Sequence, residues 1–268
     1  MRETYPVNGA LACWDLGVSS LPDAQAAFDS WGSVSIKPRS ENERLRAALS
    51  DYKGKDKDKI IQRMKKRGKL EVCDVERGET HNDYTSNFTA SVKDNVVSTN
   101  YGWADTSRIQ ALFDHHSTIC TPGQLSAALV EQVKTWHGIT YGRSSGGFYW
   151  LHEDQAKRLE QLAQALVSVA VEGSNEVTIT WAEMSPSAAR AVTQGLNKEI
   201  EAAVKKILDD LDTLQDEEAI EKRKQDADDM MEKIAEYETI LGGGLDGLKA
   251  ITGYAREMAV KAAMLVGV

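Results

Sequence analysis

The segment LNKEIEAAVKKILDDLDTL, from Leu196 to Leu214, decides the C-terminal part of the fold. Its apolar residues recur at spacings of four and three, which is the period of one buried face of an α-helix. They are Leu196, Ile200, Ala203, Ile207, Leu211 and Leu214. The pattern predicts a helix of roughly 27 residues that starts near Ser187, and at a rise of 1.5 Å per residue this helix is about 40 Å long.

Two further apolar series follow this helix along the chain. The second keeps a seven-residue register around Arg223 and consists of Ile220, Ala227, Met230, Ile234, Tyr237 and Leu241. The third follows the helix-breaking LGGGLDG and consists of Leu248, Ile251, Ala255, Met258, Ala262 and Leu265. The spacing therefore predicts a long antiparallel helical hairpin, paired as a coiled coil, and a third helix that packs against the pair.

The chain before this helical region mixes helix and strand signals. From Leu70 onward the period falls toward two in segments rich in Val, Thr and aromatic residues, namely LEVCDVERG, YTSNFTASV and VVSTNYGW. Such alternation is typical of antiparallel strands. We therefore predict an α+β fold: an antiparallel sheet with flanking helices over residues 1–185, followed by the coiled-coil hairpin and packing helix over residues 186–268.

Local signals mark helix starts and one turn in the first domain. Ser40 with Glu43, and Thr121 with Gln124, have the spacing of capping boxes, so we expect a helix to begin after each pair. The Asp94-Asn95 pair between two valines favours a two-residue hairpin turn, because both central residues of that turn need positive φ.

The stretch YGRSSGGFYWL, from Tyr141 to Leu151, predicts the tip and second strand of a hairpin over residues 139–151. A phosphate-binding Walker loop would lie between a strand and a helix and end in Gly-Lys-Ser/Thr, and the chain has no such tripeptide. We expect Arg143 and the two serines after it to be exposed at the tip. Either Phe148 or Trp150 should be buried, because side chains alternate along a strand.

A basic segment over residues 51–69 interrupts this acidic protein. It carries nine Lys or Arg against three Asp, and we interpret it as a linker or mobile helix. Three readings of its charge remain open: a solvated connection, docking on an acidic helical face of this chain or of a neighbour, and contact with nucleic acid. Residues 197–240 carry fifteen acids against seven bases, so the chain contains complementary charge blocks.

The sequence offers no convincing catalytic or cofactor site. The run GRSSG at 142–146 has the letters of GxSxG, but it is expected between two strands and not at a strand-to-helix turn, and its serines have no base or acid at a diagnostic spacing. There is no HExxH motif, and the acidic pairs are typical of a solvated helix face. Cys13, Cys73 and Cys120 are odd in number and far apart, which indicates reduced thiols. The adjacent His115 and His116 favour a helix C-terminus over a metal site. We therefore expect no enzymatic activity, no catalytic residue, no metal and no cofactor.

Charge and hydropathy limit the compartment and the partners. The net charge of −9 and the pI near 5.2 argue against whole-surface binding to nucleic acid or to an anionic membrane. The N-terminus has no apolar core of a signal peptide, and no stretch reaches the ~20 apolar residues of a membrane span. We expect a cytoplasmic protein without a membrane partner.

Part of the chain resembles a group of uncharacterised proteins from phages and other mobile elements. The resemblance rests on the run ITYGRSSGGFYWLHEDQAKRLEQLAQAL, followed by an acidic helical hairpin that ends in EKIAEYETILGG. It covers roughly residues 121–243 and implies a fold pattern and a setting of conflict between phage and host. It implies no activity and no functional residue.

These observations favour a non-enzymatic assembly or adaptor protein that acts through coiled-coil self-association or partner docking. Its expected partner is a second copy of the chain, or a host or phage protein. The alternative is a nucleic-acid-binding regulator that uses the basic segment 53–69 and the hairpin 139–151, with a winged-helix order of helix, turn, helix and hairpin. The candidate partner-binding residues are Arg143, Lys65, Lys66 and Arg67.

Overall fold

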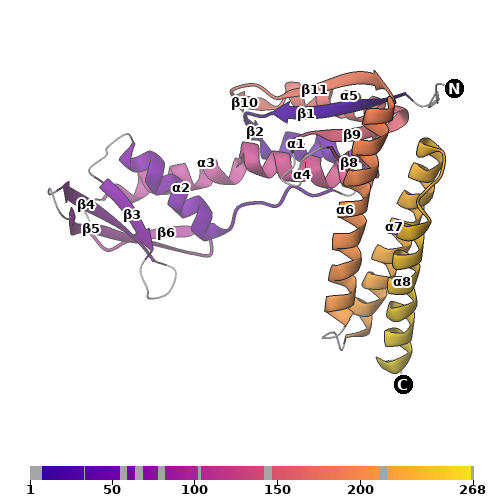
Figure 1. Ribbon diagram of the computed structural model, residues 1–268. Coiled ribbons are helices and arrows are strands. Elements are labelled where there is room, and N and C mark those ends of the chain that lie inside the picture. Colours follow the sequence, from indigo (N-terminus) through magenta and orange to yellow (C-terminus); the bar gives the residue numbers. More distant parts are fainter. Residues whose placement is uncertain are drawn as a thin grey trace. The chain divides into compact units, whose positions relative to one another are not determined.

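The computed structural model describes residues 8–32, 34–54, 59–63, 69–77, 82–101, 104–141, 147–211 and 216–266. They form two compact units, and Figure 1 shows the elements of each. Unit 1 is drawn from Met1–Asp15, Leu129–Gln164 and Glu176–Val268, and unit 2 from Leu16–Ala128 and Ala165–Asn175. Both units combine helices with antiparallel strands, which confirms the predicted α+β fold class.

Unit 1 is built on a four-stranded antiparallel sheet in the order β11-β1-β9-β8. The strands are β1 (Asn8–Asp15), β8 (Ile139–Thr140), β9 (Tyr149–His152) and β11 (Glu176–Glu183). β1 pairs with β11 along its whole length and with β9 on its other side. Helix α5 (Glu153–Val167) follows β9 directly, and its residues up to Gln164 belong to this unit.

The predicted hairpin of residues 139–151 is confirmed as the antiparallel pair β8 and β9, in which Ile139 lies opposite Trp150. Trp150 is 1% exposed and Phe148 is 54% exposed, so the tryptophan is the buried one of the two. Alternation is not the reason, because residues two apart share a face of a strand and the consecutive residues Tyr149–Leu151 are all buried. Arg143 and the two serines of the tip lie outside the described residues.

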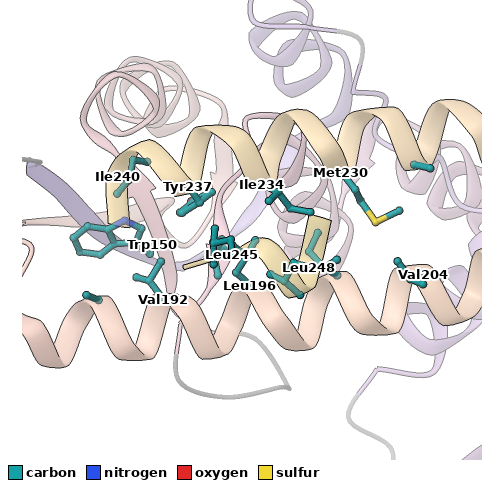
Figure 2. Packing of buried hydrophobic residues seen from close by; sticks show 14 of the residues in the cluster. Trp150, Val192, Leu196, Val204, Met230, Ile234, Tyr237, Ile240, Leu245 and Leu248 are labelled. Atoms are coloured by element: carbon teal, nitrogen blue, oxygen red, sulfur yellow. The ribbon is translucent and has the colours of Figure 1, made fainter. Parts of the chain in front are cut away.

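Three helices form the C-terminal region that the apolar spacing predicted: α6 (Pro186–Leu211), α7 (Glu217–Leu241) and α8 (Asp246–Val266). Gly242 adopts φ 77° and ends α7, because only a residue without Cβ takes this conformation freely. α8 packs against both α6 and α7. Figure 2 shows their buried side chains pointing toward one another, with Trp150 of the hairpin in the same cluster.

Unit 2 contains a second four-stranded antiparallel sheet, in the order β3-β4-β5-β6. Its strands are β3 (Lys59–Arg63), β4 (Leu70–Arg77), β5 (Asn82–Lys93) and β6 (Val96–Thr99). Helices α2 (Glu41–Lys53) and α3 (Thr106–Thr118) pack against it (Figure 1). Their shared core consists of Leu45, Ala48, Leu49, Leu70, Val72, Phe88, Ala90, Val97, Ala104, Ile109 and Phe113. Asp94 and Asn95 have φ of 50° and 63°, which confirms the predicted turn between β5 and β6.

A small sheet completes unit 2, with β2 (Val18–Ser20) between β7 (Ile119–Cys120) and β10 (Ala170–Glu172). The short helix α1 (Leu21–Asp29) follows β2, and α4 (Pro122–Thr135) follows β7 and continues into unit 1. None of the described helices combines the length and the apolar character that crossing a membrane requires.

The structure differs from the expected linker or mobile helix in the basic segment. Residues 51–53 complete α2, and residues 59–63 form strand β3, which pairs with β4. Ile60 and Ile61 explain this placement, because β-branched residues favour a strand. Unit 1 combines β-strands from the first 185 residues with the C-terminal helices. The expected boundary at residue 185 concerns independent folding, and it stays a prediction that deletion of residues 187–268 would test.

Candidate anion-binding pocket

A basic pocket of about 770 Å³ lies within unit 2. It is bordered by the irregular segment 34–39, by α2, by β3 and by the start of α4. The lining residues are Lys37, Pro38, Arg39, Glu43, Arg46, Ala47, Ser50, Lys53, Lys59, Ile60, Ile61, Thr121 and Gln124. Among these described residues five are cationic and only Glu43 is acidic, so the pocket has the electrostatic character of an anion site.

Helix α2 supplies the longest wall of the pocket. Its lining residues Glu43, Arg46, Ala47, Ser50 and Lys53 recur at helical spacing and therefore share one face. The opposite face is held in the core of unit 2. The polar face must consequently point outward toward the pocket.

A capping box determines where α2 begins. The backbone N–H of Glu43 donates to Ser40 Oγ (3.4 Å), and the backbone N–H of Ser40 donates to Glu43 Oε2 (2.8 Å). The backbone N–H and the hydroxyl of Ser40 both donate to Oε2 of Glu43, and these two bonds, with a smaller contribution from the charge of Arg39, lower the pKa of Glu43. The prediction of a capping box at this position is confirmed.

The second predicted capping box orders the start of α4. Gln124 N–H donates to Thr121 Oγ1 (3.2 Å), and Thr121 N–H donates to Gln124 Oε1 (3.0 Å). Gln124 Nε2 also donates to the carbonyl oxygen of Lys37 (2.6 Å), which ties the segment 34–39 to the helix. The N-terminus of a 14-residue helix thus borders the pocket and adds partial positive charge.

Arg39 lies at the end of a three-residue chain of polar contacts. Its Nη1 is 3.0 Å from Nδ1 of His116, and Nε2 of His116 is 2.8 Å from Oδ2 of Asp51. His116 is buried, whereas Asp51 is about half exposed. The imidazole therefore positions the guanidinium of a pocket residue while it contacts a carboxylate on α2.

The two units differ in their overall charge. Unit 2 contains sixteen Lys or Arg and sixteen Asp or Glu, so the whole net charge of −9 belongs to the residues of unit 1. The basic pocket therefore lies in the electrically neutral unit. An anionic ligand approaching it meets less repulsion than the charge of the whole chain indicates.

The structure includes only part of the predicted basic site. Lys65, Lys66 and Arg67 lie outside the described residues, as Arg143 does. Lys53 and Lys59 of the same basic segment do line the pocket. The sequence did not indicate Lys37, Arg39 and Arg46 as pocket residues, because they precede the basic segment. Arg46 could have been found from its position on the polar face of the helix predicted after Ser40.

Unit 1 contains a buried polar network in which the pKa values of two groups are shifted. Lys233 Nζ donates to Glu199 Oε1 (2.7 Å) and to the carbonyl oxygen of Gly138 (3.1 Å), and burial lowers the pKa of Lys233. Tyr237 Oη donates to the carbonyl oxygen of His137 (2.9 Å), and burial raises the pKa of Tyr237. These contacts attach α7 to α6 and to the turn before β8, so their role is structural.

Metal and thiol chemistry find little support in the described part of the chain. No group of three or more His, Cys, Asp or Glu residues there is placed to hold a metal ion. Cys13, Cys73 and Cys120 are free thiols. Burial raises the pKa of both Cys73 and Cys120, which disfavours the reactive thiolate.

Comparison with known proteins identifies a family but no activity. No curated protein and no solved structure shows significant similarity to this chain. The model of DUF6744, described as a family of unknown function, matches residues 45–263 and so spans most of both units. The chain therefore belongs to the DUF6744 family of unknown function.

Proposed function

We propose that the protein is a non-enzymatic adaptor that holds a phosphate-bearing polymer, a nucleic acid, at the basic pocket of unit 2. The observation that supports this proposal is the convergence of five cationic side chains from three elements on one concave surface. This function combines the adaptor role with the nucleic-acid alternative that the basic segment suggested.

The composition of the pocket favours phosphate as the bound group. Proteins contact nucleic-acid phosphates with Arg and Lys, with hydroxyl side chains and with helix N-termini. Lys37 and Arg46 are exposed, the exposed Ser50 adds a hydroxyl, and α4 begins at the pocket edge. Guanidinium groups also match the geometry of phosphate oxygens better than a point charge does.

Binding of a short fluorescein-labelled DNA duplex, followed by anisotropy at several salt concentrations, tests the proposal. The logarithm of affinity should fall linearly with the logarithm of salt, because bound phosphates release counterions. The double variant Lys37→Glu/Arg46→Glu removes two exposed cations from the pocket. Its affinity at about 0.1 M salt should be lower by about 50-fold or more, and its salt slope smaller by about 2.

The matched control is Lys205→Glu/Lys206→Glu, which makes the same charge change on exposed positions of α6 in unit 1. It should reduce affinity much less, because neither residue lines the pocket. Equal losses in the two double variants would show a non-specific charge effect and contradict the proposal. Tighter binding of polyglutamate than of the duplex would reassign the partner to an acidic protein.

Assembly through the C-terminal helices is a second candidate function. The exposed Glu218, Asp229 and Glu232 lie along one stripe of α7 in the acidic unit 1, so the helical region offers a surface for a basic partner or a second copy. Here the coiled-coil pairing expected from the sequence would act between chains, in the setting of phage and host conflict that the resemblance suggests. Light scattering should then give a mass above that of one chain, and a monomer at every concentration would contradict it.

A further inference from the structure

The contact between Arg39 and His116 links the basic pocket to a titratable group. We infer that protonation of His116 releases Arg39 toward the pocket and thereby strengthens anion binding as the pH falls. This inference rests on the proposed function and adds a regulatory property to the same site.

The two contacts of His116 define its tautomer. An arginine side chain only donates hydrogen bonds, so Nδ1 of His116 must present its lone pair to Nη1 of Arg39, 3.0 Å away. An ionised carboxylate only accepts, so Nε2 must carry the hydrogen that points to Asp51, 2.8 Å away. The arrangement therefore requires the neutral Nε2–H form of His116.

Protonation breaks one of these two contacts and strengthens the other. The added proton binds Nδ1, which then has no lone pair and faces a guanidinium as a second cation. The bond from Nε2 to Asp51 becomes an ion pair and is strengthened. Arg39 loses its acceptor and is repelled, and because His116 is 9% exposed, water screens this repulsion poorly.

The released guanidinium has a short path to the pocket, because Arg39 already lines it. The groups that face His116 are Asp51 of α2, Arg39 of the irregular segment and the neighbouring His115 of α3, whose ring centroid is 5.8 Å away. Cys120 of β7 interacts electrostatically with Arg39. Cys120 stays neutral because burial raises its pKa. His115 is a second imidazole beside His116, so it needs its own control.

The expected gain follows from counterion release. One additional phosphate contact by Arg39 increases the salt slope for duplex DNA by about 0.9, which corresponds to about a five- to tenfold gain in affinity at about 0.1 M salt. Histidine as a residue type changes charge between about pH 5 and pH 8, so the affinity is best compared at two pH values near the ends of that interval. By linkage, bound DNA should favour protonation of His116 by the same factor.

The test compares duplex affinity and salt slope at about pH 8 and about pH 5.5 in the wild type and in His116→Gln. Glutamine can accept from Arg39 with its oxygen and donate to Asp51 with its nitrogen, so this variant keeps the neutral arrangement at both pH values. The wild type should gain about five- to tenfold on acidification, and His116→Gln should gain less than about twofold. His115→Gln is the matched control and should retain the gain.

A second variant guards against a folding defect in His116→Gln. Arg39→Gln removes the side chain that responds and also one cation of the pocket, so its affinity should be lower than that of the wild type at both pH values, and acidification should raise it by less than about twofold. A full gain in both His116→Gln and Arg39→Gln would overturn the inference and leave the proposed function standing. Absence of duplex binding by the wild type at either pH would overturn both.

Discussion

Replacing Gly195 with alanine should destabilise unit 1, although alanine is the better helix former. Gly195 lies in the middle of α6, where that helix crosses β8. A Cβ atom at this position would lie 2.5 Å from the carbonyl oxygen of Thr140 and 2.8 Å from Cγ2 of Ile139. The first obstacle is backbone in a paired strand, so α6 has to move as a whole.

The magnitude is a difference of two opposing contributions. Alanine gains about 1 kcal/mol over glycine in a helix interior. Forcing an extra methyl group into a closely packed site costs about 2–3 kcal/mol when backbone is displaced. We expect Gly195→Ala to lower the free energy of unfolding by about 1–2 kcal/mol, which lowers the melting temperature by roughly 2–8 °C for a unit of this size.

Gly253→Ala in α8 is the matched control. Apart from its chain neighbours and the backbone of its own helix, no described atom lies within 4 Å of a Cβ built on Gly253. Only the helix-propensity gain should therefore appear, and this variant should be more stable by about 0.5–1 kcal/mol. Thermal and urea unfolding followed by circular dichroism would measure both variants. An unfolding free energy for Gly195→Ala equal to or above that of the wild type would refute the close approach of α6 to β8.

The remaining predictions concern buried groups of unit 1. Trp150→Ala should cost about 3 kcal/mol or more in unfolding free energy, whereas Phe148→Ala should change it by less than about 0.5 kcal/mol, because only the tryptophan is buried. Burial raises the pKa of Tyr237 above 10, so above pH 10 the folded state retains a proton that the unfolded state loses. The free energy of unfolding should therefore fall above pH 10. Denaturation curves at several alkaline pH values should show a smaller fall for Tyr237→Phe. Glu199→Gln should lower the free energy of unfolding by about 2 kcal/mol, because the buried Lys233 loses its ionised partner. The double variant Lys233→Met/Glu199→Gln should recover part of that loss, because it no longer buries an unpaired charge.

Much of the fold could be predicted from local patterns in the sequence. The buried face of α6 could be predicted because Leu196, Ile200 and Ile207 repeat at the helical period. Residues at this period lie on one side of a helix, and an apolar side is buried. The capping box at Ser40 and the Asp94-Asn95 turn were readable because their hydrogen bonds and dihedrals involve residues within a few positions.

The strand β3 shows where local reasoning failed. The surrounding lysines favoured a solvated linker or mobile helix, yet residues 59–63 pair with β4. Pairing places Ile60 opposite Cys73 and Ile61 opposite Val72, and this cross-strand contact outweighs the weak local preference. The partner strand β4 begins at Leu70, directly after the basic segment, so a window confined to that segment does not contain it.

The sequence by itself determined the helical face of α2, the apolar seams of the C-terminal helices and the presence of a basic segment, because each is a property of neighbouring residues. Only the tertiary structure decided that Arg46 of α2, Lys59 of β3 and Arg39 border one pocket, and that His116 contacts Arg39. Cations repel one another, so no local attraction gathers them. The packing of α2 and α3 on the sheet brings them together, because burial of the apolar core stabilises unit 2 by more than the repulsion among its surface charges costs.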